Sequence, residues 1–315
     1  MNESLQTFKK IIENVEKVIA GKREAVELAL IALACDGHVL IEDVPGVGKT
    51  SLVSSIAKSI DCSFKRIQFT PDILPSDITG FTIYNQKTGN FEFKPGAVMS
   101  NIILADEINR TSPKTQASLL EVMEENQVTV DGVTYKVPKP FMVLATQNPV
   151  EYLGTYPLPE AQLDRFTLKI TIGYPSPSDE SLILTRFKVD NPLASLTPVT
   201  DGQYIVSLQK TVKEIYVDNS LNRYIVDIVD ATRKNPEVLL GASPRGSLSL
   251  FRASQAWAFY NSRDYVLPDD IKKMVIPVLS HRILLRQEAK LKKITPEEIL
   301  RTILKNITVP AVIAK

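Results

Sequence analysis

The pattern of apolar positions changes character twice along the chain. From about residue 4 to residue 36, apolar residues recur at the spacing of an amphipathic helix, with a break near Ala20 and Gly21. Short apolar runs of strand length follow, at residues 38–41, 64–69, 101–105, 141–146 and 167–172. Helical segments separate most of these runs. This alternation predicts an α/β fold, a parallel five-stranded sheet sandwiched by helices.

Two insertions interrupt the alternation of strands and helices. Residues 81–93 alternate between apolar and polar positions on both sides of a central turn, and residues 128–137 alternate about Asp131-Gly132. Asp-Gly favours a type I′ turn, so the second segment carries the stronger hairpin signal. We therefore expect two hairpin insertions in the α/β domain.

Helical periodicity dominates after Pro175-Ser176-Pro177-Ser178, where the strand-like runs stop. The clearest helices are expected at residues 222–233, 247–261, 268–279 and 296–304. We predict an α/β domain at residues 1–176, followed by a small all-helical domain at residues 177–315.

Composition and charge exclude several classes of protein. The chain has 315 residues, of which 44% are hydrophobic and 23% charged, as is typical of a soluble globular protein of about two domains. A net charge of +1 gives no general attraction to nucleic acid or to an anionic membrane. Cys35 and Cys62 form no metal or disulfide pattern, which fits a reducing cytoplasm, and nothing resembles a signal peptide or membrane span. His38 and His281 lack neighbours for metal or nucleophilic chemistry and are interpreted as structural.

Residues 40–50, LIEDVPGVGKT, are the first candidate for chemistry. A predicted strand enters a glycine-containing loop and a helix starts at Lys49, so backbone N–H groups and the helix dipole converge on one point. Lys49 would neutralise the phosphates of ATP, and the Thr50 hydroxyl would ligate Mg²⁺. The residues expected to form the cradle are Pro45, Gly46, Val47, Gly48, Lys49, Thr50 and Ser51. A strand–turn–helix without a ligand is the alternative.

One position departs from the usual phosphate-binding loop. Asp43 stands where that loop has its first glycine, six places before the lysine. Aspartate tolerates unusual turn geometry better than most residues. We expect its carboxylate to point away from the phosphates, because a carboxylate facing them would repel the nucleotide.

Two later apolar runs end in polar side chains. Asp106 and Glu107 follow the run at 101–105, and Asn148 follows the run at 141–146. Ligands of parallel sheets bind at the carboxyl ends of the strands. Asp106 is then placed to hold Mg²⁺, Glu107 to orient and deprotonate the attacking water, and Asn148 to help position that water. Taken alone, each of these motifs could simply end a strand.

These motifs, in this order, resemble those of AAA+ ATPases, and more closely those of the MoxR family. The resemblance rests on GHVLIEDVPGVGKT, LADEINRTSPKTQASLLEVMEENQVTVDG, ATQNPVEYLGTYPLPEAQLDRF and GASPRGSLSL, which lie between residue 37 and about residue 250. It implies a P-loop α/β domain with a helix-two insert at about 81–93 and a pre-sensor-1 hairpin at about 128–137, followed by a helical lid. It also implies ATP hydrolysis with ATP and Mg²⁺ as cofactors.

The resemblance implies roles for residues that the pattern alone leaves ambiguous. Arg165 matches the arginine finger, which reaches the γ-phosphate held by a neighbouring subunit. Arg245 matches the sensor-2 arginine and is expected to act on the nucleotide of its own subunit. Val18 and Ile19 fall where the family packs the adenine. Gln68 is a candidate for the polar switch that restrains the catalytic glutamate when no client is bound.

The function that the resemblance implies is that of a ring-forming, chaperone-like motor, with a hexamer as the expected ring. Many MoxR proteins act with a partner that carries a von Willebrand factor A domain, so such a partner and a protein client are expected. We expect a cytoplasmic location, no nucleic-acid partner and no direct membrane insertion.

Three alternatives remain open at this point. They are a magnesium-chelatase-like motor subunit, a DNA- or transcription-related AAA+ motor, and a non-hydrolysing, ATP-gated scaffold. The near-zero charge counts against DNA, and the first insert lacks the GAFTGA sequence of transcriptional activators. A protein that only binds ATP has no need of Glu107, Asn148 or Arg165.

Overall fold

The centre of the molecule is a parallel sheet, seen in a computed structural model that describes residues 2–148, 154–188 and 191–310. The order across the sheet is β2-β5-β8-β1-β9, and every neighbouring pair is parallel. The five strands confirm the five predicted runs; they are β1 (Val39–Glu42), β2 (Phe64–Gln68), β5 (Ile102–Asp106), β8 (Met142–Gln147) and β9 (Leu168–Ile170). Because β8 lies between β5 and β1, the residues that follow these three strands meet at one carboxyl edge.

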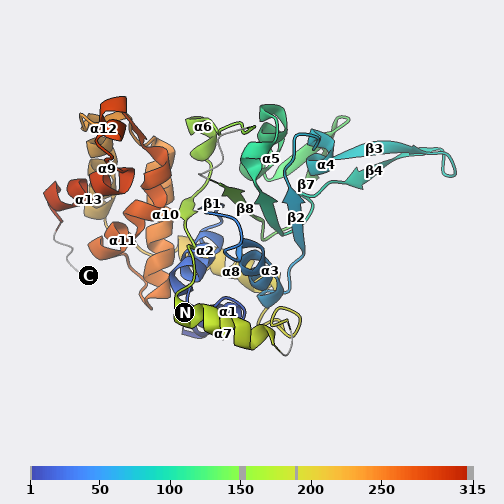
Figure 1. The fold of residues 1–315 in the computed structure, drawn as a ribbon, viewed down its shortest axis with the longest axis horizontal. Coiled ribbons are helices and arrows are strands. Elements are labelled where there is room, and N and C mark those ends of the chain that lie inside the picture. The colour runs from blue at the N-terminus through green and yellow to red at the C-terminus, as the bar shows by residue number, and fades with distance from the viewer. Residues whose placement is uncertain (1, 149–153, 189–190, 311–315) are drawn as a thin grey trace.

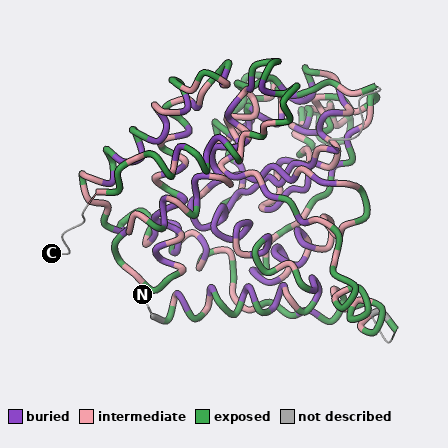
Figure 2. The backbone as a smooth tube through the Cα atoms, turned by 60° about the vertical axis from the view of Figure 1, so that its left-hand side comes forward, coloured by how far each residue is buried: buried purple, intermediate pink, exposed green. Residues whose placement is uncertain are grey.

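Both faces are buried along the inner strands β1, β5 and β8, which is why these strands read as continuous apolar runs, whereas the edge strand β2 is largely exposed. Val39 and Ile41 of β1 pack into one core with helices from the start of the chain, whereas Leu40 packs into the other with α5. Figure 1 shows these helices on opposite sides of the sheet, and in Figure 2 buried backbone runs through the middle of the molecule. The helices are α1 (Asn2–Glu16), α2 (Arg23–Ala34), α3 (Lys49–Ser59) and α5 (Pro113–Glu125).

Two antiparallel hairpins are inserted into the α/β part, as predicted. The first, β3 (Gly80–Asn85) with β4 (Asn90–Pro95), projects far from the body (Figure 1). The second consists of β6 (Gln127–Val130) and β7 (Val133–Lys136). Its turn residues, Asp131 and Gly132, have φ values of 50° and 78°, as a type I′ turn requires.

The C-terminal part is mainly helical and lies at the opposite end of the molecule from the β3–β4 hairpin (Figure 1). Its helices are α9 (Asn219–Lys234), α10 (Pro244–Tyr260), α11 (Pro268–Leu279), α12 (Gln287–Leu291) and α13 (Pro296–Asn306). It also contains a small antiparallel sheet that the periodicity did not predict, β10 (Val238–Leu240) with β11 (Leu284–Leu285). Strands of this length are too short to show a period of two residues.

The segment between these two parts packs against the α/β helices. The side chain of Gln209, in α8, donates to the carbonyl of Leu33 in α2 at 2.8 Å, and the N–H of Val199 donates to the carbonyl of Ser59 at 2.8 Å. The domain boundary expected at residue 176 therefore stays a prediction. The remaining helical pieces are α4 (Pro75–Thr79), α6 (Glu160–Leu163), α7 (Pro177–Phe187), α8 (Gly202–Lys213) and 3₁₀ turns at Ile108–Arg110 and Ser280–Arg282. Among the described residues, no helix is long and apolar enough to cross a membrane.

Candidate functional site

Two glycines in left-handed conformation form the turn that follows β1. Gly46 has a φ of 85° and Gly48 a φ of 88°, values that side chains with a Cβ disfavour. A Cβ placed on Gly46 would meet no atom within 4 Å. Helix α3 begins at Lys49, directly after Gly48, so its first N–H groups and its dipole face this turn. The predicted phosphate-binding geometry is therefore present.

Lys49 lies between the loop and the acidic residues at the carboxyl edge. Its Nζ donates to the backbone carbonyl of Asp43 at 2.7 Å. Partial burial lowers the pKa of Lys49, while the negative charges of Asp43, Asp106 and Glu107 act to raise it. The ammonium is thus close to the ends of both β1 and β5, where it can neutralise phosphate charge.

The carboxylate of Asp43 points away from the glycine turn, which confirms the prediction. Its Oδ2 accepts from the N–H groups of Ile172 and Gly173, each at 2.6 Å, and its Oδ1 accepts from the N–H of Val44 at 2.9 Å. Asp43 is only 6% exposed, and its φ is not positive, so the position does not require glycine. Asp43 instead ties the start of the loop to the segment that follows β9.

Asp106 and Glu107 are both fixed by Thr146 on the neighbouring strand β8. The Thr146 hydroxyl donates to Asp106 Oδ1 at 2.7 Å and accepts from the N–H of Glu107 at 2.8 Å. In the sequence, Thr146 is recognisable only as the last residue of an apolar run. Thr146 lies two residues before Asn148, a spacing that puts both side chains on the same side of an extended chain, and this was the available signal.

Three side chains cover this carboxylate pair. Arg66 donates to Asp106 Oδ2 through Nη2 at 2.6 Å and through Nε at 3.1 Å. Gln68 donates through Nε2 to Glu107 Oε2 at 2.9 Å, and Arg110 Nη1 lies 3.0 Å from the same oxygen. The contact expected between Gln68 and Glu107 is confirmed. Arg66 also donates to Gln68 Oε1 at 2.6 Å, so these two residues of β2 form one unit, of which sequence reasoning found only the glutamine.

The residues at this edge fit a nucleotide-bound magnesium ion. Mg²⁺ prefers oxygen ligands and is commonly held by one or two carboxylates together with substrate phosphates. Thr50 lies in the first turn of α3 and Asp106 ends β5, so both offer such oxygens. Within residues 2–148, 154–188 and 191–310, no group of three or more His, Cys, Asp and Glu side chains could hold a metal without a nucleotide.

The positions of three other predicted residues agree with a nucleotide site without testing their roles. Val18 and Ile19 are 6% and 8% exposed, and Ile19 Cδ1 lies 3.9 Å from the point that a Cβ on Gly48 would occupy. Asn148 follows β8, between the ends of β5 and β1, and is buried. Residues 149–153, which follow it, lie outside the described residues.

Arg165 and Arg245 lie at the opposite edge of the sheet. Both contact the carboxylate of Glu124: Arg165 Nη2 lies 3.2 Å from Oε2, and Arg245 Nη2 donates to Oε1. The preceding residue, Met123, accepts through its carbonyl from Nε2 of His38 at 3.0 Å. His38 immediately precedes β1, whereas the phosphate loop follows the other end of that strand. At about 3.3 Å per residue, the length of β1 separates the two places by about 13 Å.

The structure does not place Arg245 beside Lys49 of its own subunit, so the expected action on that subunit's nucleotide is not shown. Arg245 starts the lid helix α10, but it converges with Arg165 on one carboxylate, away from Lys49. Glu124 is a further residue that the sequence analysis missed, because a glutamate on a helix normally reads as a solvated charge.

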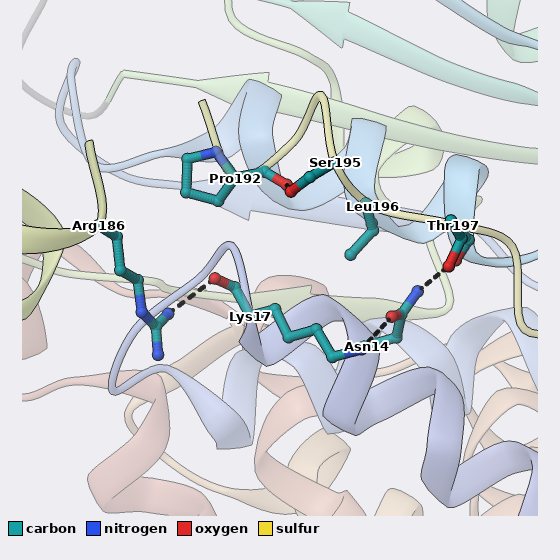
Figure 3. Close-up of a pocket in the computed structure, with 7 residues that line it drawn as sticks. All are labelled: Asn14, Lys17, Arg186, Pro192, Ser195, Leu196 and Thr197. Carbon is teal, nitrogen blue, oxygen red and sulfur yellow. Dashed lines mark hydrogen bonds between the residues drawn. The ribbon is translucent and has the colours of Figure 1, made fainter. Parts of the chain in front are cut away.

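The pocket in Figure 3 is lined by residues from the end of α1, from α7 and from the segment 192–197, and by none of the predicted site residues. It has a volume of about 360 Å³ and contains two cations, Lys17 and Arg186. Lys17 donates to the side chain of Asn14 at 3.0 Å, and Arg186 donates to the carbonyls of Glu16 and Lys17, each at 2.9 Å. Both cations thus form hydrogen bonds with groups at the end of α1, and we assign no chemistry to this pocket.

Comparisons with known proteins point the same way as the geometry. Residues 38–168 match the ATPase family associated with various cellular activities (AAA), and residues 230–303 match the AAA lid domain. The chain is 54% identical over 301 residues to the uncharacterized protein YeaC of Bacillus subtilis, covering 96% of this chain and 94% of the relative. It is 42% identical over 317 residues to Chaperone MoxR1 of Mycobacterium tuberculosis, covering 98% and 84%. A crystal structure of a protein from Cytophaga hutchinsonii, assigned as an ATPase, matches with a TM-score of 0.92 and 42% identity, covering 98% of this chain and 96% of that one.

Proposed function

Because the chain belongs to the MoxR family of AAA+ ATPases, we propose that it is a magnesium-dependent, ring-forming motor that remodels partner proteins. The observation that carries this proposal is the separation of two charged groups on one subunit. Lys49, Asp106 and Glu107 gather at the carboxyl edge of the sheet, and Arg165 and Arg245 gather at the amino edge. The carboxyl edge holds the groups that bind the phosphates and activate water, and the amino edge holds the arginines that can stabilise the charge of the transferred phosphate.

At the carboxyl edge, the residues divide the work of ATP hydrolysis. Bound Mg²⁺ would supply positive charge to the phosphates, with Thr50 and Asp106 holding it. Lys49 and the N–H groups of the loop bind the phosphates, and Glu107 accepts a proton from the attacking water. Thr146 keeps the two acidic residues in register through its hydroxyl.

Glu107 is restrained in the arrangement described here. One of its oxygens receives hydrogen bonds from both Gln68 and Arg110. Such bonds hold the side chain in one position, so the carboxylate is not free to turn toward an attacking water. We infer that release of these contacts precedes proton transfer and limits turnover until a client is engaged.

Arg165 and Arg245 act on the nucleotide of a neighbouring subunit. Both contact Glu124 near the amino end of β1, and the length of β1, about 13 Å, lies between that end and their own phosphate loop, so in this proposal they meet the γ-phosphate of a second copy of the chain. Contact between opposite edges of identical subunits is head-to-tail, and such contacts generate rings when they close. A hexamer is the ring that we propose. An arginine supplied in this way contributes roughly 10³ to 10⁵ in rate, which makes hydrolysis depend on assembly.

The client and the partner are proteins in this proposal. The relative from Mycobacterium tuberculosis is named a chaperone, and the projecting hairpin exposes Tyr84 (56%) and Phe91 (75%), whose rings lie 5.3 Å apart. Exposed aromatic residues are suited to contacts with another protein. We propose a cytoplasmic motor that acts with a partner carrying a von Willebrand factor A domain.

Two substitutions test the division of labour between subunits. Glu107→Gln should bind ATP with wild-type affinity and lose nearly all phosphate release. Arg165→Ala should also bind ATP and lose turnover, but excess Glu107→Gln protein should restore it, because the Glu107→Gln subunits still donate an intact arginine. Wild-type turnover in Glu107→Gln would refute the assignment of the base, and an absence of rescue would refute the in-trans arginine.

A further inference from the structure

The segment that carries Arg165 is attached to the lid by the side chain of Arg282. Arg282 Nε donates to Asp164 Oδ1 at 2.7 Å. Its Nη2 donates to the backbone carbonyl of Asp164 at 3.0 Å and to that of Phe166 at 2.7 Å. A second lid residue, Ser243, donates through its hydroxyl to Asp164 Oδ2 at 2.6 Å. The residues on both sides of the arginine finger are therefore held by the lid.

Arg282 is also bound within the lid itself. Its Nη1 donates to the carbonyl of Val278 in α11, and its Nη2 donates to the hydroxyl of Ser249 in α10 at 3.1 Å. The side chain is only 1% exposed. Burial lowers the pKa of Arg282 to about 10, against the raising effect of the Asp164 charge. A planar guanidinium with five donors can join these groups in one fixed arrangement, whereas a lysine has three donors at a single point.

We propose that Arg282 is a positioning residue for ATP hydrolysis on the neighbouring subunit, because it fixes the arginine finger to the lid. This inference rests on the proposed in-trans role of Arg165. Arg165 directly follows Asp164, and Arg245 follows Ser243 by two residues, with its N–H donating to the Ser243 hydroxyl at 3.0 Å. Both arginines thus flank the same junction between the core and the lid.

Fixing this junction has a direct consequence for the reaction. Arg165 comes from the core and Arg245 from the lid, yet both have to reach one phosphate in the proposed function. If the two parts rocked against each other, the two guanidinium groups would lose their common target. A misplacement of about 1 Å can cost roughly 10²-fold in rate. Arg282 acts through these arginines and touches no substrate itself.

Conservative substitutions separate positioning from folding. In Arg282→Lys the positive charge facing Asp164 remains but the fork of donors is lost, and in Asp164→Asn the shape remains but the charge is lost. We expect each variant to bind ATP with wild-type affinity and to release phosphate about 10²-fold more slowly. The matched control is Arg263→Lys. Arg263 donates to both oxygens of buried Asp270, each at 2.5 Å, and to the carbonyl of Tyr265, so its printed bonds stay within the lid. The control should keep its turnover within about twofold.

Mixed assemblies of the full chain give the decisive readout. Excess Glu107→Gln protein should restore phosphate release to Arg282→Lys, since the defect lies in the arginine that a subunit donates and not in the nucleotide site that it owns. A loss of ATP affinity in both Arg282→Lys and Asp164→Asn would overturn the inference. So would an absence of rescue when Arg165→Ala is rescued in parallel. If Arg165→Ala itself is not rescued, the in-trans proposal fails instead. Should Arg282→Lys not fold, Asp164→Asn carries the same comparison.

Discussion

Restoring the usual first glycine of the phosphate loop should damage this protein. Asp43→Gly would restore the usual phosphate-binding loop sequence, but it would remove the acceptor for the N–H groups of Ile172 and Gly173. Ile172 is 6% exposed, so water cannot readily replace the lost carboxylate oxygen at its N–H. The backbone at Asp43 is not in the left-handed region, so glycine gains nothing in conformation there.

The size of the effect follows from these two hydrogen bonds. A hydrogen bond to a charged group contributes about 1.5–3 kcal/mol, so the two bonds at 2.6 Å together contribute about 3–6 kcal/mol. The extra backbone freedom of glycine in the unfolded chain adds about 0.5–1 kcal/mol. Because whole domains are stable by about 5–15 kcal/mol, the variant should lose a large part of its free energy of unfolding.

Urea unfolding at pH 7 without nucleotide measures this loss. Asp43→Asn should fall between wild type and Asp43→Gly, because its amide keeps one acceptor oxygen without the charge. The control is Asp61→Gly, at an exposed position with a φ of 47°, where glycine should change the free energy of unfolding by at most about 0.5 kcal/mol. If Asp43→Gly is as stable as wild type, or binds ATP more tightly, the role argued for this carboxylate is refuted.

Two other groups of residues give predictions of the same kind. Arg66→Ala should lower the Mg²⁺ concentration needed for half-maximal phosphate release by about two- to fivefold. The reason is that the partly exposed ion pair of Arg66 with Asp106, which contributes up to about 1 kcal/mol, no longer competes with Mg²⁺ for that carboxylate. An unchanged Mg²⁺ requirement would contradict this competition. Gln68→Ala should raise basal turnover by a similar factor by freeing the catalytic glutamate, and lower turnover in the same assay would contradict the restraint. His38 accepts from the N–H of Val143 through Nδ1 at 3.0 Å, and burial lowers its pKa to about 4, from an unfolded value near 6.5. As pH falls from about 6.5 to 4, His38 is protonated in the unfolded chain but stays neutral in the folded chain, so the free energy of unfolding decreases by about 3 kcal/mol over this window. His38→Gln should remove most of this pH dependence, measured by urea unfolding at pH 7 and pH 4.5. An unchanged pH dependence would refute the argument.

The fold was predictable because local pattern and tertiary burial agree. The three inner strands β1, β5 and β8 are covered on both faces and appear as apolar runs, and the lid helices show plain helical periodicity. The β10–β11 pair was not predictable, because its strands have 3 and 2 residues and acquire strand geometry only by pairing across some 45 residues of chain.

The site was predictable only as far as its motifs run along the chain. Lys49 and Glu107 lie in continuous signatures, and the structure brings them to one edge. The role of Arg66 depends instead on the pairing of β2 with β5, which sets Gln68 opposite Asp106 and Arg66 two residues earlier. No pattern within β2 alone contains that register. Registers between distant strands are fixed by the whole core and not by local sequence.

The position of Arg245 could not be predicted from the sequence for a related reason. A match to a lid arginine says which helix carries the side chain but not which edge of the sheet that helix faces. The position is decided by packing, since Ser243 and Arg282 bind Asp164 and so bring the start of α10 to the finger segment. Contacts between residues 79 and 118 positions apart cannot be read from either segment by itself.

Strand β9 connects the two chemical edges of a subunit, and this explains why an aspartate suits position 43. The segment that carries Arg165 leads directly into β9, and the residues that leave the strand, Ile172 and Gly173, donate to the Asp43 carboxylate in the phosphate loop. Any movement of the loop that displaces Asp43 must either break these two short bonds or shift the end of β9. Because β9 has 3 residues and pairs with β1 along its length, it has little freedom to absorb such a shift internally. A glycine at position 43 would leave the phosphate loop without a bond to the segment after β9. With the Asp43 carboxylate, the phosphate loop is linked to one end of β9, and the arginine offered to the next subunit precedes the other end.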